Sequence, residues 1–402
     1  MQKDKHLIPK LRFSEFEGKW RQKKLKDYTV INPRNEVLPN SFIYIDLESV
    51  NNGVLLKEER ILKKEAPSRA QRLLQENDIL YQTVRPYQKN NYFFNNLAID
   101  YVASTGYAQI RTSQNPRFVY QYLNTHYFVN KVLLRCTGTS YPAINSSDLS
   151  QIKVSFPPLE EQQKIANFIT AIDTRLQILE KKKALLEQYK KGVMQQIFKQ
   201  KIRFKNEGGE VFPKWRKYQL LEIADRIKTK NKIDNQNVLT ISAQLGLVSQ
   251  LEYFNKSVSS KNLTGYYLLE KDDFAYNKSY SNGYPMGAFK RLNKYDFGVV
   301  STLYICFRFN EKVSLDFMEQ YFETGLQNQE IEKVAQEGAR NHGLLNIGVN
   351  DFFEIDLKIP CVEEQTKIAN FLSAIDKKTT LVNEQIEKTK TYKKGLLQQM
   401  FV

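Results

Sequence analysis

Two stretches of the chain share one pattern of apolar residues, spaced alternately four and three positions apart. In 160–198 the pattern falls on Ile165, Ile169, Ile172, Leu176, Leu179, Leu186, Val193 and Ile197. In 363–401 it falls on Ile368, Leu372, Ile375, Val382, Ile386, Leu396 and Met400. A repeat of 3.5 residues is typical of helices that pair through one apolar seam. Both stretches are therefore predicted to be long helices of a coiled coil.

Polar residues interrupt this seam and bear on its partner. The interruptions are Lys183, Lys190, Thr379, Thr389 and Lys393. The segment 180–191, "EKKKALLEQYKK", is too charged for a helix that is buried all round. Pairing of the two helices with each other, antiparallel, is the simplest solution, and separate docking of each helix into a larger core is the alternative. At ~1.5 Å per residue, each helix would extend roughly 58 Å.

The two helical stretches are copies of one sequence. "EEQQKIANFITAID" begins at Glu160, and "EEQTKIANFLSAID" begins 203 residues later at Glu363. "YKKGVMQQIF" and "YKKGLLQQMF" keep the same separation. In both copies a proline precedes the two glutamates, which suits a helix start because proline and carboxylates complement the free amide groups there. Weaker matches, such as Trp20 with Trp215, extend the duplication to a unit of about half the chain. Chance similarity remains an alternative for these scattered matches.

The segments outside the helices combine short strands with turns. Aromatic and β-branched runs alternate with Asn, Gly and Pro, which predicts strands in 41–53, 77–86, 91–106, 237–246, 272–279 and 295–309. A short helix is expected in 117–133 and in 315–334. The chain is thus predicted to be α+β, with a pseudo-two-fold repeat of modules 1–156 and 202–359 and helices 157–201 and 360–402.

The charge of the chain indicates an acidic partner. The 402 residues are 41% hydrophobic and 12% aromatic, which supports folded cores, and the net charge is +16 with a pI near 9.4. A basic surface attracts polyanions, so nucleic acid is the leading candidate. Residues 1–156 carry a net +9 and residues 202–359 only +1. The second module would therefore have to bind nucleic acid with a local patch.

Several function classes find no support in the sequence. The three cysteines form neither a disulfide framework nor a metal-binding pair, which suits a reducing cytoplasm. No run approaches 18 apolar residues, and no secretion signal is recognisable, so we expect no membrane association. Phosphate-binding loops, HExxH and methyl-donor motifs are missing, and the segment at Asn32, "NPR", falls short of an amine-methylation motif. His6, His126 and His342 lack metal-ligand spacing. The chain is predicted to be non-catalytic and to bind no metal or cofactor itself.

Turns in both modules carry the candidate nucleic-acid contacts. Arginine and lysine can contact phosphates or guanine, and asparagine can pair with adenine. The candidates of the first turn are Arg85, Tyr87, Lys89 and Asn90, and those of the second are Lys278, Tyr280, Asn282, Tyr284 and Arg291. Weaker candidates are Arg69, Arg72, Arg340 and Asn341. For any one of them, a solvated charge or a core aromatic is the alternative. Because the frame residues agree between copies and the turns do not, two similar scaffolds would read two different sequences.

The chain resembles, from end to end, the specificity subunits of type I restriction-modification systems. The resemblance rests on "PPLEEQQKIANFITAID" and "PCVEEQTKIANFLSAID", on the two "YKKG" segments, and on "GKWRQKKLKD", "DILYQTVRPY", "STGYAQIR" and "YNKSYSNGYPMGAFKR". One small departure is Cys361 and Val362, where the first copy has Pro158 and Leu159.

The resemblance implies a function and its partners. Two target-recognition domains would each bind half of a split double-stranded DNA site, and the paired helices would set the unspecified gap. Two methyltransferase subunits would dock about the helices and methylate a flipped-out adenine with S-adenosylmethionine. Two restriction/translocase subunits, using ATP and Mg²⁺, would join them. Two other classes stay open: a coiled-coil adaptor whose charge is incidental, and a nuclease or methyltransferase with an unrecognised site.

Overall fold

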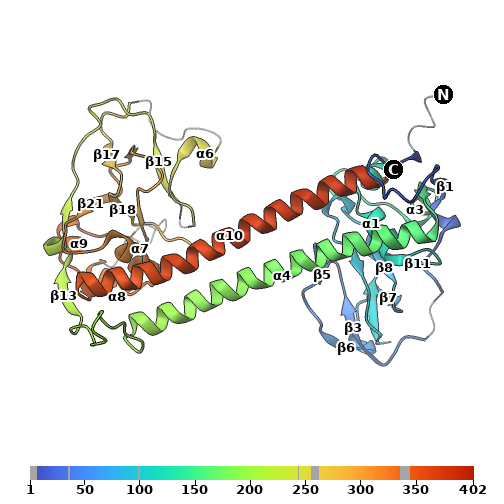
Figure 1. Cartoon of the computed structure of the whole chain (residues 1–402), viewed down its shortest axis with the longest axis horizontal. Helices are drawn as coiled ribbons and strands as arrows, with labels where there is room; N and C mark the ends of the chain where they lie inside the picture. The colour runs from blue at the N-terminus through green and yellow to red at the C-terminus, as the bar shows by residue number, and fades with distance from the viewer. Residues whose placement is uncertain (1–6, 35–36, 98–99, 243, 255–261, 336–344) are drawn as a thin grey trace. The chain divides into compact units, whose positions relative to one another are not determined.

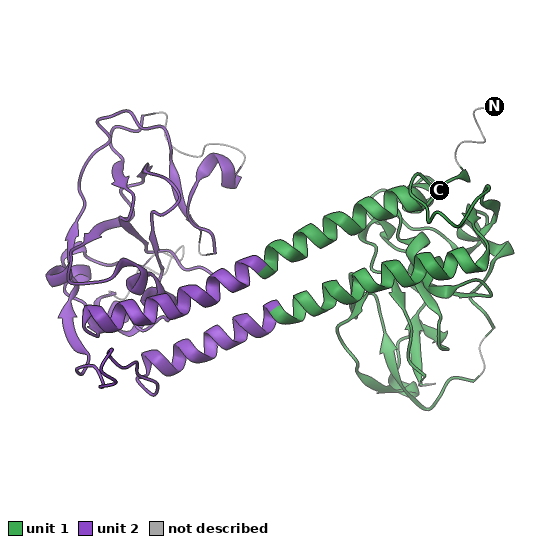
Figure 2. Cartoon of the chain, viewed as in Figure 1, with its two compact units in different colours: residues 1–182, 382–402 green, residues 183–381 purple. Residues whose placement is uncertain are grey.

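The chain folds into two compact units, each of which combines a module with parts of both long helices. The computed structural model describes residues 7–34, 37–97, 100–242, 244–254, 262–335 and 345–402 (Figure 1). One unit consists of residues 1–182 and 382–402, and the other of residues 183–381 (Figure 2). The units are hereafter called unit 1 and unit 2. Because the boundaries fall inside the long helices, each module keeps the helical residues that pack on it.

Unit 1 contains twelve strands and three short α-helices among its described residues. The strands are β1 (Arg21–Lys24), β2 (Thr29–Ile31), β3 (Ser41–Ile45), β4 (Val50–Asn51), β5 (Val54–Leu55), β6 (Arg60–Leu62), β7 (Ala70–Leu73), β8 (Ile79–Gln82), β9 (Tyr92–Phe93), β10 (Tyr101–Ser104), β11 (Tyr107–Thr112) and β12 (Lys153–Phe156). The helices are α1 (Pro116–Leu123), α2 (His126–Leu133) and α3 (Ser146–Ser150).

Unit 2 repeats much of this order. Its strands are β13 (Arg216–Gln219), β14 (Ala224–Arg226), β15 (Leu239–Ser242), β16 (Gly246–Ser249), β17 (Tyr267–Glu270), β18 (Phe274–Asn277), β19 (Ala288–Arg291), β20 (Phe297–Val300), β21 (Ile305–Phe309) and β22 (Asp356–Ile359). Its short helices are α5 (Leu220–Ile223), α6 (Gln250–Phe254), α7 (Leu315–Glu323), α8 (Asn328–Val334) and α9 (Val349–Phe353).

Sheet topology identifies the duplicated frame. Unit 1 has a sheet of order β2-β11-β8-β9 and a ribbon β1-β12, and unit 2 has the matching sheet β14-β21-β18-β19 and ribbon β13-β22. The rest differs, because unit 1 adds a four-stranded sheet, β6-β3-β10-β7, where unit 2 has two separate pairs, β15-β16 and β17-β20. The duplication therefore covers the half of each module that meets the helices.

The long helices are α4 (Leu159–Phe198) and α10 (Val362–Met400). In unit 1, Asp173 pairs with Lys393 at 2.6 Å and Glu180 pairs with Lys390 at 3.2 Å. Because the partner number falls as the α4 number rises, the helices are antiparallel. Every predicted seam residue is buried or half-buried, which confirms the coiled-coil pattern.

The ends of both helices also enter module cores. Ile165, Ile169 and Ile172 lie in the unit 1 core, and so does Phe401, which directly follows α10. In unit 2 the end of α4, Phe198, packs in the core with the start of α10. Both arrangements that the sequence left open are therefore present: ion pairs join α4 to α10 within each unit, and the ends of both helices are parts of larger cores.

Most of the predicted secondary structure is confirmed. All six strand runs contain strands. The single helix expected in 117–133 is wrong, because the side chain of Thr125 accepts a hydrogen bond from the Phe128 amide and starts a new helix, α2, after α1 has ended. The segment 315–334 is likewise divided into α7 and α8, near Gly325, which has a left-handed backbone (φ +72°).

No helix in the described residues is both long and apolar enough to cross a membrane.

Candidate nucleic-acid interface

In unit 1, the turn between β8 and β9 carries four of the candidates. Arg85 and Lys89 have left-handed backbones, with φ of 53° and 56°, at either end of the 3₁₀ turn Pro86–Gln88. The Arg85 guanidinium lies over the ring of Tyr141, 4.1 Å from its centroid, a cation–π contact. Tyr141 is 64% exposed and Tyr87 is 49% exposed. Tyr87 of the turn and the neighbouring Tyr141 therefore expose their rings, while Arg85 is half-buried and its Nε is buried without a hydrogen-bond partner in the described residues. Tyr141 was not foreseen from the sequence.

Lys89 is part of a basic cluster that the fold assembles. Its ammonium donates to the carbonyl of Asn124 at 3.0 Å. Burial lowers the pKa of Lys89, and the nearby charges of Lys394 and Lys393 on α10 lower it further. Residues some 300 positions apart in the chain thus form the cluster Lys89, Lys393 and Lys394, in which Asp173 neutralises Lys393. No sequence signal pointed to this proximity.

The remaining unit 1 candidates differ in accessibility, because Arg69 is exposed while Asn90 and Arg72 are half-buried. The side chain of Asn90 accepts a hydrogen bond from the Asn52 amide at 3.1 Å. Arg69 is exposed beside β7. Arg72, on β7, is half-buried, and burial lowers its pKa. Its Nε finds no hydrogen-bond partner in the described part of the chain.

In unit 2, the turn between β18 and β19 presents different residues. Ser281 and Tyr284 close a tight turn, with Tyr284 N–H donating to Ser281 O at 2.8 Å. Gly283 takes the left-handed conformation (φ +85°) that such a turn requires of its third residue. Tyr280 is 64% exposed and Asn282, at the tip, is exposed as well. Lys278 is half-buried.

Two candidates of this turn are occupied by contacts inside unit 2. The Tyr284 hydroxyl donates to the carboxylate of Glu323, and its pKa is raised by burial and by that carboxylate. Arg291 is paired with both Asp272 and Asp316. In the free chain these side chains hold the turn and β19 rather than face solvent. Arg340 and Asn341, together with His342, lie outside the described residues.

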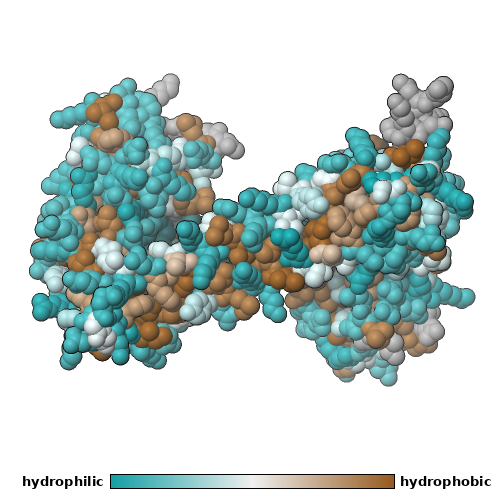
Figure 3. Space-filling model, in the orientation of Figure 1, coloured by the Kyte–Doolittle hydropathy of each residue, from teal (hydrophilic) through white to brown (hydrophobic). Residues whose placement is uncertain are grey.

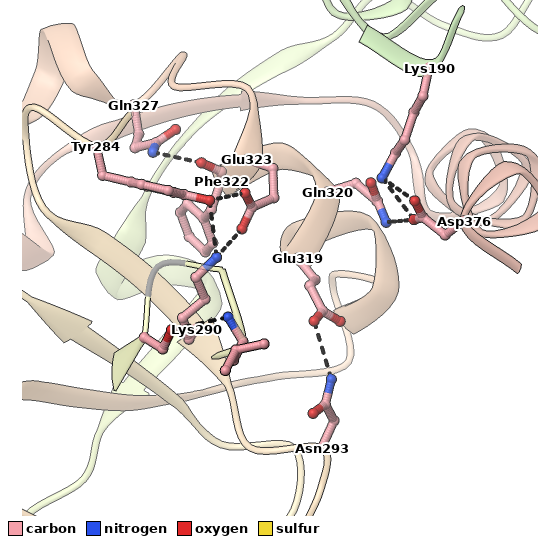
Figure 4. A network of polar contacts seen from close by, with 12 residues as sticks. Lys190, Tyr284, Lys290, Asn293, Glu319, Gln320, Phe322, Glu323, Gln327 and Asp376 are labelled. Carbon is pink, nitrogen blue, oxygen red and sulfur yellow. Dashed lines mark hydrogen bonds and ion pairs between the residues drawn. The ribbon is translucent and has the colours of Figure 1, made fainter. Parts of the chain in front are cut away.

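The two units share a set of polar contacts, here called the polar frame, that joins a module helix to the long helices. In unit 1, Gln121 donates to Asp173 at 2.7 Å, and Asp173 pairs with Lys393. In unit 2, Gln320 donates to Asp376 at 3.0 Å, and Asp376 pairs with Lys190 at 2.7 Å (Figure 4). Two of the lysines that interrupt the seam, Lys190 and Lys393, thus have a structural use, because each neutralises a carboxylate that ties a module helix to the long helices.

The paired glutamates at the helix starts belong to the same frame. Glu161 is fully buried and pairs with Arg12 at 2.7 Å, and Glu364, nearly fully buried, pairs with Arg203 at 2.7 Å. The sequence predicted these carboxylates to interact with the helix dipole. Their ion pairs were missed because Arg12 and Arg203 lie near module starts, about 150 residues before their partners.

The described residues hold no group of three or more histidine, cysteine or carboxylate side chains that could bind a metal. Cys136, Cys306 and Cys361 are free thiols. Burial raises the pKa of Cys306 to about 12, so this thiol is protonated and unreactive at neutral pH.

Comparison with known proteins identifies the family. The family model described as the type I restriction modification DNA specificity domain matches residues 17–188 and 213–391. The chain is 28% identical over 171 residues to the type I restriction enzyme HindI specificity subunit of Haemophilus influenzae, a match that covers 41% of the chain and 33% of that relative. It is 34% identical over 90 residues to the MjaVIII specificity subunit of Methanocaldococcus jannaschii, covering 22% of the chain and 21% of the relative. The matched segments thus span a third or less of these relatives.

Solved structures share the fold along nearly the whole chain. The type I restriction-modification S subunit from M. genitalium aligns with a TM-score of 0.59 at 13% identity, covering 98% of this chain and 99% of that one. A chain from work on complex assembly and conformational transition of the type I R-M system aligns with a TM-score of 0.54 at 20% identity, covering 94% and 96%. These likenesses confirm two tandem modules with a pair of long helices. The chain belongs to the family of the type I restriction modification DNA specificity domain, of which it carries two copies.

Proposed function

We propose that the chain recognises a bipartite DNA site, with one module reading each half, and that it is the non-catalytic scaffold for the modification and restriction subunits. One observation carries the proposal. The frame of the two units is the same in sheet order and in its polar ties to the helices, whereas the solvent-facing turns differ in sequence and in backbone. Two copies of one scaffold that present different side chains suit the reading of two different sequences.

The unit 1 turn combines the features of a DNA-contacting surface. The cluster Lys89, Lys393 and Lys394 supplies positive charge for phosphates, and Arg85 with Tyr141 and Tyr87 supplies groups suited to base edges and sugars. The long helix thereby adds charge to the surface of the module. Phosphate contacts fix the position of a protein on the duplex and make binding salt-dependent.

Replacing Lys89 and Lys394 together with glutamine is expected to weaken DNA binding to all sequences. The slope of log affinity against log salt should become shallower by about 1 to 2, since each lost phosphate contact contributes about 0.9. Fluorescence anisotropy with a labelled duplex at several salt concentrations measures this slope. Lys26→Gln, which removes an exposed lysine outside the cluster, is the control and should leave the slope nearly unchanged. An unchanged slope in the double variant would exclude the cluster from the interface.

The tips of the turns are proposed to read bases. Asn282→Ala should weaken the base preference in one half-site. The free energy of discrimination at the contacted base pair should fall by about 1–3 kcal/mol. Tyr87→Ala should affect the other half-site. Selection from a pool of duplexes with randomised sequence shows which positions each variant still specifies. If both variants altered the same half-site, the assignment of one module to each half would be wrong.

The helices carry a duplicated apolar surface that suits two copies of one partner. Ile178 and Tyr189 on α4 match Leu381 and Tyr392 on α10 in the repeat, and these four side chains are between 49% and 62% exposed. Each unit holds one aliphatic residue and one tyrosine of the set. Apolar (brown) surface is visible along the helices in Figure 3. Exposed apolar groups repeated by an internal duplication support docking of two methyltransferase subunits at equivalent places.

In this proposal the chain supplies recognition and its partners supply the chemistry, with S-adenosylmethionine, ATP and Mg²⁺. Co-expression of the chain with its modification subunits, followed by single-molecule sequencing that detects methylated adenine, tests the whole proposal. We expect methylation in two short sequences separated by a constant gap. Methylation in a continuous site would contradict the bipartite proposal, and turnover by the isolated chain would contradict the non-catalytic role. A plain adaptor would show no dependence of methylation on sequence.

A further inference from the structure

The turn between β18 and β19 of unit 2 is held by an ion pair in which the lysine is buried and the glutamate is partly exposed. Lys290, on β19, has a side chain that is only 10% exposed and pairs with Glu323 at the end of α7. The Lys290 ammonium also donates to the Tyr284 hydroxyl at 3.2 Å, and that hydroxyl donates to Glu323. These three residues, here called the latch, form a closed triangle in which each side chain contacts the other two (Figure 4).

Other contacts leave the base of the turn little freedom. The Tyr276 hydroxyl donates to the carbonyl of Met286 at 2.8 Å. Gly287 has φ of +78°, and a Cβ there would lie 2.3 Å from the carbonyl of Asn277, so only glycine fits. These contacts hold the end of β18 and the start of β19 in place. The latch holds the turn between them through Tyr284. Between these fixed points, Tyr280 and Asn282 are exposed.

Helix α7 connects the latch to the long helices. Glu323 lies at its C-terminal end, and Gln320, one turn earlier, donates to Asp376 of α10, which pairs with Lys190 of α4. Figure 4 shows the latch and this tie as parts of one polar region around α7. The latch therefore connects the turn, through α7, to the same long helices that the polar frame contacts.

The corresponding turn of unit 1 is held mainly by amide side chains, together with the contact of Lys89 to the Asn124 carbonyl. Gln82 donates to Gln88 at 2.9 Å and accepts from the Asn90 amide at 3.1 Å. The side chain of Asn91 donates to that of Asn124 at 3.0 Å. The frame tie is common to both units, whereas an ion pair between a buried lysine and a glutamate beside the turn is found, among the described residues, in unit 2 alone.

On the basis of the proposed function, we propose that Tyr284, Lys290 and Glu323 are positioning residues for the second half-site. The latch holds the 278–287 turn in the conformation in which Tyr280 and Asn282 meet the DNA, and it acts on this half-site only. A buried ammonium that loses its carboxylate is strongly unfavourable, so loss of Glu323 would release Lys290 and the turn together. Preorganisation of this kind increases affinity by reducing the ordering that binding requires.

The test compares Glu323→Gln and Tyr284→Phe in the full chain, with Glu330→Gln as the control. Glu330 pairs with Lys333 on α8 and does not touch the latch. Hydrogen exchange followed by mass spectrometry measures opening of the 278–287 turn in the free chain, and selection from randomised duplexes measures which bases are specified. We expect exchange in the turn to rise roughly tenfold and base preference to fall in one half-site, with the other half-site and the control unchanged.

Two results would overturn this inference. One is wild-type exchange of the turn in both latch variants. The other is faster exchange with full base preference retained in both half-sites. Tyr284→Phe removes one hydroxyl and keeps the Lys290–Glu323 pair. If Glu323→Gln unfolds unit 2, the Tyr284→Phe variant alone still tests the proposal. If the wild-type chain selects no pair of sequences, the proposed function fails, and the exchange data then separately decide whether the latch holds the turn.

Discussion

Replacing Phe401 with alanine is expected to destabilise unit 1 by about 3–5 kcal/mol, the usual cost of truncating a buried phenylalanine. Phe401 follows the last residue of α10 and is buried in a core otherwise built mainly from the first half of the chain. Its ring stacks on Phe118 at 5.4 Å and lies edge-on to Trp20 at 6.3 Å. The substitution should therefore loosen the attachment of α10 to the module.

Phe198 provides the matched variant in unit 2. It stacks on Phe317 at 5.7 Å and lies edge-on to Trp215 at 6.0 Å. Phe317 and Trp215 are the unit 2 equivalents of Phe118 and Trp20. Phe198→Ala should destabilise unit 2 by a similar amount. Thermal unfolding gives the size of each effect. The buried thiol of Cys306 belongs to unit 2 and reports on that unit. Phe198→Ala should accelerate its alkylation, and Phe401→Ala should do so much less. Equal acceleration by both would contradict cores that unfold separately.

Replacing Arg203 with methionine is expected to cost about 3–5 kcal/mol, because it leaves the carboxylate of Glu364 buried without its cation. The guanidinium contacts Glu364 through Nε and Nη2 at 2.9 and 2.7 Å. It also donates to the carbonyls of Phe212 and Pro213. Urea unfolding measures the loss. Arg12→Met is the equivalent change in unit 1, where the cation pairs with Glu161.

A double variant separates the charge from the packing. Arg203→Met combined with Glu364→Met removes both charges, so part of the stability should return relative to Arg203→Met alone. If the double variant were as unstable as the sum of the two single variants, the ion pair would not be the cause. In that case the carbonyl contacts of Arg203 would account for its importance.

The repeated elements of the fold could be predicted because their signals are local. The four-and-three spacing that starts at Ile165 and Ile368 depends on residues one or two turns apart, and the buried seam reproduces it. The break between α1 and α2 was missed because it depends on one capping side chain, Thr125, inside an otherwise helical run. A threonine in such a run is compatible with either outcome.

The candidate interface could be predicted less well, since its residues are defined by distant contacts. Tyr280 and Asn282 are accessible, as a Gly-containing turn suggests. The neighbouring Tyr284 and Arg291 are half-buried and already paired, because their carboxylate partners lie on α7 and before β18. Lys394 entered the candidate surface only through the fold, which brings it near Lys89. Residue type identifies a polar turn, but charge pairing across the fold determines which side chains remain available.

The most direct measurement is a selection by the wild-type full-length chain from duplexes with randomised sequence, followed by sequencing of the bound fraction. We expect two short specified sequences, different from each other, at a constant separation, with no base preference in the gap between them. One uninterrupted specified sequence, or two specified sequences whose separation varies freely, would contradict it.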